Sequence, residues 1–132
     1  MTSHHEPLVK VAPEFFVRDV GASVRFYVEK LGFVLLRQEP VFAVVALGDA
    51  HVLLAHESIA PDRAELGSTT RGAGVNVRIM VDDVDAVYER AKANGVRIVH
   101  DIADRYYGLR DFIVADPDGF MLRFAADLTK TR

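Results

Sequence analysis

The chain has 132 residues, half of them hydrophobic, and a formal net charge of -3 at pH 7. This length suits one compact core and is short for two ordinary domains, so we predict a single domain over residues 1–132. Acidic and basic residues are interspersed without a basic stripe, which argues against nucleic acid as a partner. No apolar run is long enough to cross a bilayer, so no membrane partner is expected.

The sequence contains no cysteine, which removes disulfides, thiolate metal sites and cysteine nucleophiles from consideration. This composition suits a reducing compartment, and the first residues lack the apolar segment of a signal peptide, so we expect a cytoplasmic protein. Thr2-Ser3-His4 would chelate Cu(II) or Ni(II) if Met1 were removed, because an amine, two amide nitrogens and an imidazole converge there. We expect this segment to be a tail without function.

The first half of the chain predicts one strand, one helix and three further strands. Asp19 is suited to cap a helix that ends at Gly32, where glycine is the usual residue beyond a helix C-terminus. Runs rich in β-branched and aromatic residues predict the strands at residues 11–17, 34–37, 42–47 and 51–56.

Residues 58–74 separate this half from the next and are rich in glycine, serine and threonine. Such a composition predicts a mobile linker. We favour a plain connection, with a role as a lid over a pocket as the alternative.

The second half repeats the pattern, with a helix predicted between Asp83 and Gly95 and strands predicted at residues 75–81, 96–100, 111–115 and 120–125. The sequence D-P-D-G at residues 116–119 predicts a tight turn, since proline presets φ and glycine leaves the backbone unhindered. In the strand after this turn, Leu122 and Phe124 share one face, and Met121 and Arg123 share the other.

The two halves can be aligned with each other. Residues 17–20 match residues 81–84 at a shift of 64, and residues 44–53 match residues 113–122 at a shift of 69. Self-similarity of this kind indicates a repeated structural unit. We therefore predict an α+β fold of two tandem β-α-β-β-β units, at about residues 9–57 and 75–125.

Two motifs connect this arrangement to a known family: F-Y-x-x-x-L-G-F at residues 26–33 and D-P-D-G at residues 116–119. Together with the repeated unit, they resemble the vicinal oxygen chelate superfamily over nearly the whole chain. This group includes glyoxalase I, extradiol dioxygenases, fosfomycin-resistance enzymes and bleomycin-resistance binding proteins. The resemblance implies that the sheets curl into a cup, with the helices on its outer face.

In the metal-dependent members of that superfamily, four side chains facing the cup hold one divalent ion. Carried over to this sequence, their positions are Ala12, Leu54, Asn76 and Arg123. A divalent ion needs ligands with lone pairs, and the two hydrocarbon side chains offer none. The fixed charge of Arg123 would repel the ion. We therefore expect no metal and no other cofactor.

A relocated metal site is an alternative, because His56 follows Leu54 by two residues and Glu14 follows Ala12 by two. Two ligands do not fill a coordination shell, so we disfavour it. His56 and Glu14 are also the candidates for a general base. They support the alternative function, a divergent lyase, isomerase or oxygenase with a relocated or absent metal site.

Strand alternation and loop placement give the residues expected to line the cup and contact a ligand. They are Glu14, Phe16, Leu54, His56, Asn76, Arg78, Met80, Tyr106, Tyr107 and Arg123. The two tyrosines would close over the mouth, and the apolar members would hold a flat molecule. The arginines have a second reading that stays open, in which they form ion pairs with Glu14 or other nearby acids.

The favoured function is metal-independent binding of a small molecule, with sequestration of an antibiotic or an aromatic metabolite and a role in antibiotic resistance. The chain looks most like the bleomycin-resistance branch, which implies a homodimer and favours a binding protein over an enzyme. Two arginines face one glutamate in the expected lining, so we predict an aromatic ligand that is neutral or anionic rather than cationic.

Overall fold

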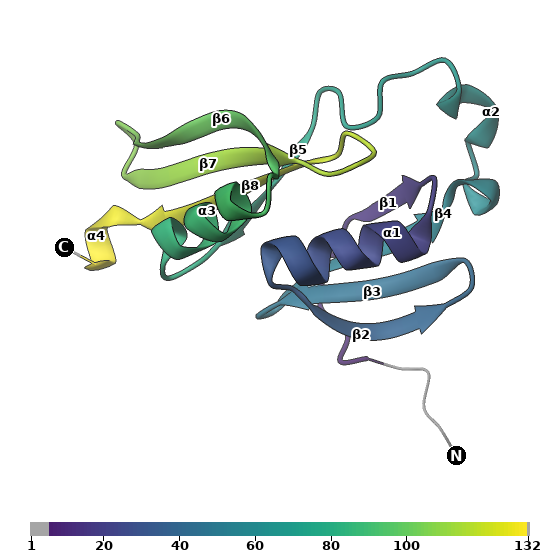
Figure 1. Cartoon of the computed structure of the whole chain (residues 1–132), viewed down its shortest axis with the longest axis horizontal. Coiled ribbons are helices and arrows are strands. Elements are labelled where there is room, and N and C mark those ends of the chain that lie inside the picture. The colour runs from purple at the N-terminus through teal and green to yellow at the C-terminus, as the bar shows by residue number, and fades with distance from the viewer. Residues whose placement is uncertain (1–5, 132) are drawn as a thin grey trace. The chain divides into compact units, whose positions relative to one another are not determined.

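The computed structural model describes residues 6–131, which form two compact units divided between Thr70 and Arg71. Figure 1 shows the strands and helices of each unit in the order of the chain. The Thr2-Ser3-His4 motif lies outside the described residues. Within residues 6–131, every helix is too short or too polar to traverse a bilayer. The single-domain organisation stays a prediction.

Unit 1 is a four-stranded mixed sheet whose strand order is β1-β4-β3-β2. Its strands are β1 (Glu14–Val17), β2 (Val34–Glu39), β3 (Phe42–Leu47) and β4 (Ala50–His56). The first strand runs parallel to β4, and the other neighbours are antiparallel. The N-terminal strand is therefore shorter than predicted, because its pairing with β4 begins only at Glu14.

Unit 2 repeats this topology, with strand order β5-β8-β7-β6 and a parallel pairing between β5 and β8. Its strands are β5 (Asn76–Met80), β6 (Arg97–Asp104), β7 (Leu109–Ala115) and β8 (Met121–Asp127). The helix α3 (Val84–Ala93) follows β5, and the short α4 (Leu128–Thr131) follows β8. Two β-α-β-β-β units with mixed sheets confirm the predicted α+β fold.

Both helices begin directly after Asp19 and Asp83, the residues predicted to cap them. Asp19 accepts a hydrogen bond from the backbone N–H of Ala22, and Asp83 accepts one from Ala86, each at 3.0 Å. These bonds satisfy N–H groups that lack partners in the first turn of a helix. Past each helix, Gly32 and Gly95 have positive φ values of 85° and 70°, the backbone conformation that favours glycine.

The first helix is not uniform: α1 (Val20–Arg25) continues as the π-helical segment η1 (Phe26–Lys30). Tyr27 in this segment is fully buried. Its ring meets those of Phe26 and Phe33 edge-on, with centroids 5.4 and 5.2 Å apart. Aromatic pairs prefer this arrangement. The aromatic residues of the F-Y-x-x-x-L-G-F motif therefore pack the core of unit 1.

The core of unit 2 lies between α3 and one face of its sheet. Tyr88 on α3 packs edge-on against Phe112, whose ring stacks on Phe124 with centroids 5.5 Å apart. Leu122 and Phe124 are both fully buried, as alternation along β8 predicted. The opposite face carries Met121 and Arg123. We call this the open face of unit 2.

The predicted linker at residues 58–74 contains regular structure. Its first residues belong to the 3₁₀ turn η2 (Glu57–Ile59), and the short helix α2 (Arg63–Leu66) follows. Figure 1 shows both as teal coils before the chain reaches β5. A role of this segment as a lid stays a prediction.

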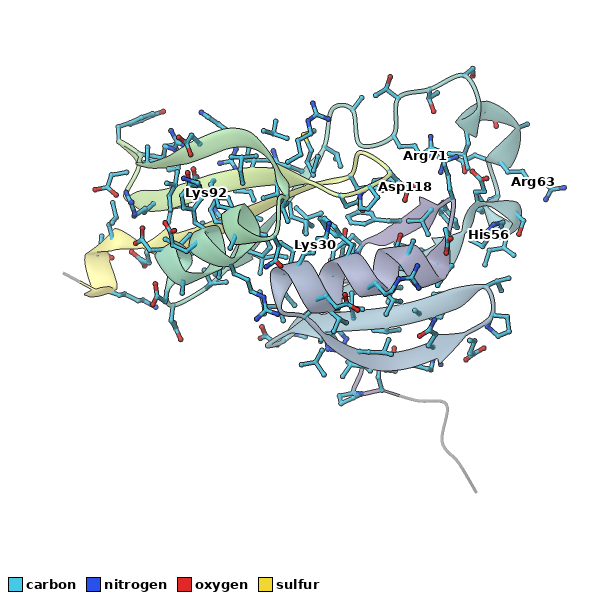
Figure 2. The ribbon with its side chains drawn as sticks, in the orientation of Figure 1. Lys30, His56, Arg63, Arg71, Lys92 and Asp118 are labelled. Carbon is cyan, nitrogen blue, oxygen red and sulfur yellow. The ribbon has the colours of Figure 1, made fainter. Side chains whose placement is uncertain are left out.

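The stretch that leads into β5 packs tightly against the predicted D-P-D-G turn. The N–H of Gly119 donates to the carbonyl oxygen of Asp116 at 3.0 Å, which closes the turn. Arg71 Nη1 lies 3.4 Å from Asp118 Oδ1, and both side chains are almost fully buried; Figure 2 shows them together. A Cβ atom at Gly72 would lie 2.2 Å from the carbonyl oxygen of Gly119, so only glycine fits there.

This contact predicts that Gly72→Ala destabilises unit 2 more than Gly95→Ala does. Both glycines have positive φ, so each alanine costs about 1–2 kcal/mol of backbone strain. Only Gly72 also meets backbone atoms, whereas nothing lies within 4 Å of a Cβ at Gly95. We expect a total loss of about 3 kcal/mol or more for Gly72→Ala in urea unfolding. Equal losses in the two variants would contradict the contact.

Candidate functional site

The turn before the last strand differs in length between the two units, and this changes the alignment of the repeat. In unit 1, Ala46, the counterpart of Ala115, pairs with His51, and four residues separate them. In unit 2, Ala115 pairs with Met121, and five residues separate them. The last strands therefore match at a shift of 70, one more than the shift of 69 that holds before the turn.

This difference corrects two of the predicted lining residues. Glu14 and Phe16 pair with Leu53 and Ala55, so these four side chains share one face of the sheet of unit 1. Leu54 pairs instead with Phe15, and His56 with Val17, on the other face. A slip of one residue moves every side chain of a strand to the opposite face. The prediction that Leu54 and His56 face the same way as Glu14 and Phe16 was wrong.

The corrected positions give both side chains structural roles. Leu54 is fully buried in the core of unit 1. His56 caps η2: its Nδ1 accepts a hydrogen bond from the backbone N–H of Ser58 at 3.1 Å and lies 2.7 Å from Ser58 Oγ. The lone pair on Nδ1 is therefore already engaged. Of the two candidate bases, Glu14 alone stays on the face predicted to hold a ligand.

The corrected alignment also moves one of the implied metal positions from Leu54 to Leu53. The four positions then carry Ala12, Leu53, Asn76 and Arg123. Two of them are hydrocarbon and one is a fixed cation, so this set does not fit a divalent ion. Among residues 6–131, no three His, Asp or Glu side chains gather closely enough to hold a metal.

On unit 2, by contrast, the structure brings the predicted residues together. Asn76 pairs with Met121, Arg78 with Arg123, and Met80 with Ala125, so all these side chains belong to the open face. Asn76, Arg78 and Met80 are exposed, and Met121 and Arg123 are partly buried. Two arginines thus occupy directly opposite positions on adjacent strands.

Diagonal to Arg123 on the same face lies a buried carboxylate that the sequence analysis did not predict. Asp111 on β7 is 2% exposed. It accepts hydrogen bonds from Arg105 Nε at 2.8 Å and Tyr107 Oη at 3.0 Å, with Arg123 Nη1 at 3.4 Å. We call these four residues the Asp111 cluster. Its signal in the sequence is an acidic residue at the start of an otherwise apolar strand, D-F-I-V-A at residues 111–115.

The cluster answers one of the alternatives left open for the arginines. Arg123 does form an ion pair, but its partner is Asp111 rather than Glu14. Tyr107 also belongs to the cluster, and its hydroxyl lies 3.3 Å from Arg123 Nη1. Tyr106 is fully exposed and packs edge-on against the ring of Tyr107 at 5.2 Å. Tyr107 therefore lies beside the open face. That the two tyrosines close over a ligand stays a prediction.

Positive charge on this face exceeds the negative charge available to balance it. Arg78 has no hydrogen bond or ion pair with any residue of the described chain. Arg123 Nε is buried, and no acceptor among residues 6–131 reaches it. Buried donors normally have an acceptor, because an unpaired one loses its hydration without replacement. Arg105 and Arg123 thus share the carboxylate of Asp111, and Arg78, opposite Arg123 in the sheet, adds a third positive charge without a carboxylate partner among residues 6–131.

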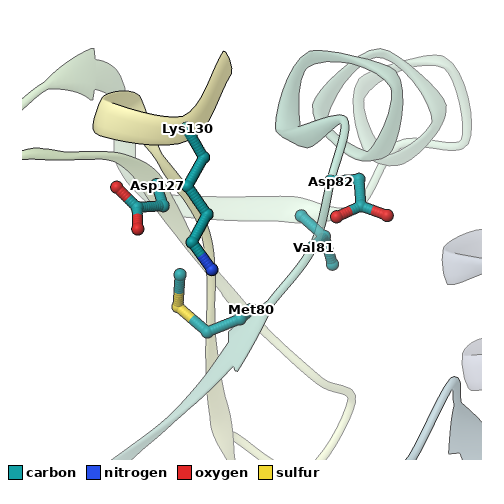
Figure 3. Close-up of a pocket in the computed structure, with 5 residues that line it drawn as sticks. All are labelled: Met80, Val81, Asp82, Asp127 and Lys130. Atoms are coloured by element: carbon teal, nitrogen blue, oxygen red, sulfur yellow. The ribbon is translucent and has the colours of Figure 1, made fainter.

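A pocket of about 200 Å³ opens at the far end of β5 and β8. It is lined by Met80, Val81, Asp82, Asp127 and Lys130, and we call it the Lys130 pocket (Figure 3). Thr129 donates to Asp127 Oδ1 from its hydroxyl at 2.6 Å and from its backbone N–H at 2.9 Å. These bonds, and then the Lys130 ammonium, hold the pKa of Asp127 below its usual value, so it is ionised at neutral pH.

With this geometry described, comparison with known proteins identifies the family. Residues 8–124 match the family model of the Glyoxalase/Bleomycin resistance protein/Dioxygenase superfamily. The chain belongs to this superfamily, which confirms the family predicted from the two motifs and the repeat.

Individual relatives agree. A protein described as a bleomycin resistance protein of Geobacillus stearothermophilus is 30% identical, over 89% of this chain and 96% of that one. The crystal structure of TioX from Micromonospora sp. ML1 has a TM-score of 0.72 at 25% identity, covering 89% of this chain and 95% of that chain. A glyoxalase/bleomycin resistance protein/dioxygenase family enzyme from Burkholderia phytofirmans, 23% identical, has a TM-score of 0.73 over 89% of this chain and 97% of its own, which shows the shared fold.

The buried carboxylate predicts a strong effect of Asp111→Asn on stability. The substitution leaves Arg105 and Arg123 without a negative partner, and breaking a buried pair costs about 3–5 kcal/mol. Because both arginines keep some contact with solvent, we expect a loss of about 2–3 kcal/mol in urea unfolding. The control is Asp85→Asn, which removes an exposed partner of Arg110 and should cost less than about 1 kcal/mol. A loss for Asp111→Asn no larger than the control would contradict the role of the cluster.

Proposed function

We propose that the protein binds a small aromatic carboxylate, or another planar anion, on the open face of unit 2 without a metal. The observation that carries this proposal is that Arg78 and Arg123 occupy opposite positions on adjacent strands. Among residues 6–131, Asp111 is the one carboxylate that forms an ion pair with either of them. Guanidinium groups present several N–H donors in a plane that matches a carboxylate. Arg78 is exposed and has such donors to offer, and the side chain of Arg123 is 27% exposed.

The surroundings of the two arginines favour a flat, partly apolar molecule. Met80, Met121 and Ala125 lie beside the arginines on the open face. Methionine thioethers make favourable contacts with aromatic rings, and their flexible side chains adapt to different shapes. The phenol of Tyr107 stands next to Arg123 and adds a further aromatic surface. An aromatic anion would use both the charge and this apolar floor.

The relatives support a binding role. A protein 30% identical to this chain is described as a bleomycin resistance protein. We therefore place this chain among the binding members of the superfamily, acting by sequestration of an antibiotic or an aromatic metabolite, and we expect a homodimer. The surplus of arginine on the open face selects against a cationic drug and in favour of an anion.

The alternative, a divergent enzyme of the superfamily, is less well supported by the corrected register. It depends on a general base or a metal, and His56 lies on the wrong face and caps η2. Glu14 is then the one predicted base left, and three of the four metal positions carry side chains that cannot bind a metal ion. A binding protein needs neither group.

The arginine pair predicts which ligands bind and which substitutions abolish binding. We expect 4'-ethylbiphenyl-4-carboxylate to bind more tightly than its neutral primary amide in calorimetric titration. Arg78→Ala and Arg123→Ala should each weaken binding of the carboxylate about tenfold, the loss of one charge-assisted contact. Arg90→Ala, which removes an exposed cation from α3, is the matched control and should leave the affinity unchanged. Equal binding of carboxylate and amide would refute the proposal.

Metal analysis distinguishes the binding role from the enzymatic one. Protein purified without an affinity tag or a metal column should contain far less than one equivalent of zinc, nickel, iron or manganese. Dialysis against EDTA should not change the affinity for the carboxylate, because protein cations supply the contacts. One bound transition metal per chain, with ligand binding that is lost on chelation, would favour the enzymatic alternative.

A further inference from the structure

The open face of unit 2 is electrically asymmetric along its strands. At one level, Arg78 and Arg123 carry positive charge, next to the cluster around Asp111. The Lys130 pocket lies at the other end, and its two carboxylates exceed its single ammonium group. Met80 and Ala125 lie between the two ends. One surface therefore runs from positive through apolar to negative.

The spacing of these features follows from strand geometry. Residues that share a face are two positions apart, about 6.6 Å along a strand. Arg123 and Asp127 are separated by two such steps on β8, so the backbone positions of the two charged levels are about 13 Å apart. Met80 lines the pocket and is also the neighbour of Arg78 on this face, which makes the pocket continuous with the arginine pair.

Asp82 is the carboxylate of the negative end that is available to a ligand. It is exposed and has no hydrogen bond or ion pair within residues 6–131. Asp127 contributes its negative charge to the pocket and accepts both bonds from Thr129 on Oδ1. Figure 3 shows the side chain of Lys130 descending between Asp127 and Val81 towards Met80. An ammonium group entering this pocket would meet two carboxylates and one cation, whereas a second anion would be repelled.

We infer that the ligand is a zwitterion with an aromatic spacer, whose carboxylate lies on Arg78 and Arg123 and whose amine enters the Lys130 pocket between Asp82 and Asp127. This inference rests on the proposed function and adds to it the chemistry of the second end of the ligand. It also gives Asp82 a binding role that neither its position in the sequence nor the arginine pair indicates.

Two probes of nearly the same shape test the inference. They are 4'-(aminomethyl)biphenyl-4-carboxylate, which has an ammonium group, and 4'-ethylbiphenyl-4-carboxylate, in which a methyl group replaces it. We expect the amine probe to bind about fivefold more tightly than the ethyl probe in calorimetric titration. This ratio reports the second end alone, because both probes have the same carboxylate.

Four substitutions test this ratio: two should change it in opposite directions, and two should leave it unchanged. Asp82→Asn removes one carboxylate from the pocket and should bring the ratio close to one. Lys130→Met removes the competing cation and should raise the ratio above that of the unmodified protein. Glu89→Gln removes the same charge as Asp82→Asn from the exposed surface of α3 and should not change the ratio. Arg123→Ala should weaken both probes by the same factor.

The outcomes separate the inference from the proposed function. Suppose that Arg123→Ala weakens binding of the ethyl probe, but the amine probe binds no more tightly than the ethyl probe to the unmodified protein. The inference of a zwitterionic ligand is then refuted, and the proposed anion site stands. The inference also fails if Asp82→Asn and Lys130→Met leave the ratio unchanged. If neither probe responds to Arg123→Ala, the anion site is refuted, and the zwitterion with it.

Discussion

The register of β8 is the constraint on which the candidate site depends. Five residues, 116–120, connect β7 to β8, and Asp116 holds this turn by accepting hydrogen bonds from the backbone N–H groups of Asp118 and Phe120. The near contact between Gly72 and Gly119 packs the entry to β5 against the same turn. With this register, Arg123 lies beside Arg78 and diagonal to Asp111; one residue fewer would turn Arg123 into the core.

The same register gives the two faces of the sheet different kinds of side chain. The face towards α3 is filled by stacked aromatic rings, which require no partner beyond the protein. The open face holds more guanidinium groups than carboxylates, and burying such groups is favourable only when each finds a counter-charge. Asp111 neutralises part of the excess and orients Arg105, Tyr107 and Arg123. The remaining donors are those that the proposed anion would contact.

Much of the fold could be predicted because its signals are local. Asp19 and Asp83 each cap a helix by accepting a hydrogen bond from the backbone N–H three residues later. Such a bond joins residues close together in the sequence, so it can be predicted from the residue type and its position. The strands of the repeat were found from their apolar runs, and the D-P-D-G turn from its residue types. The π-helical segment at Phe26–Lys30 was not predicted, because it depends on how Tyr27 packs against Phe33 and not on local preference.

The sequence by itself determined the repeated β-α-β-β-β unit, the family and the nature of the side chains available for binding, since these follow from periodicity, capping and motifs. Only the tertiary structure decided which side chains share a face. Leu54 and His56 were placed wrongly because four residues separate the paired Ala46 and His51 in unit 1, whereas five separate their counterparts Ala115 and Met121 in unit 2. A shift of one residue moves every later side chain of the strand to the opposite face. Asp111 was missed for a related reason: its partners come from a loop and a neighbouring strand, and pairing across strands is invisible in a linear pattern.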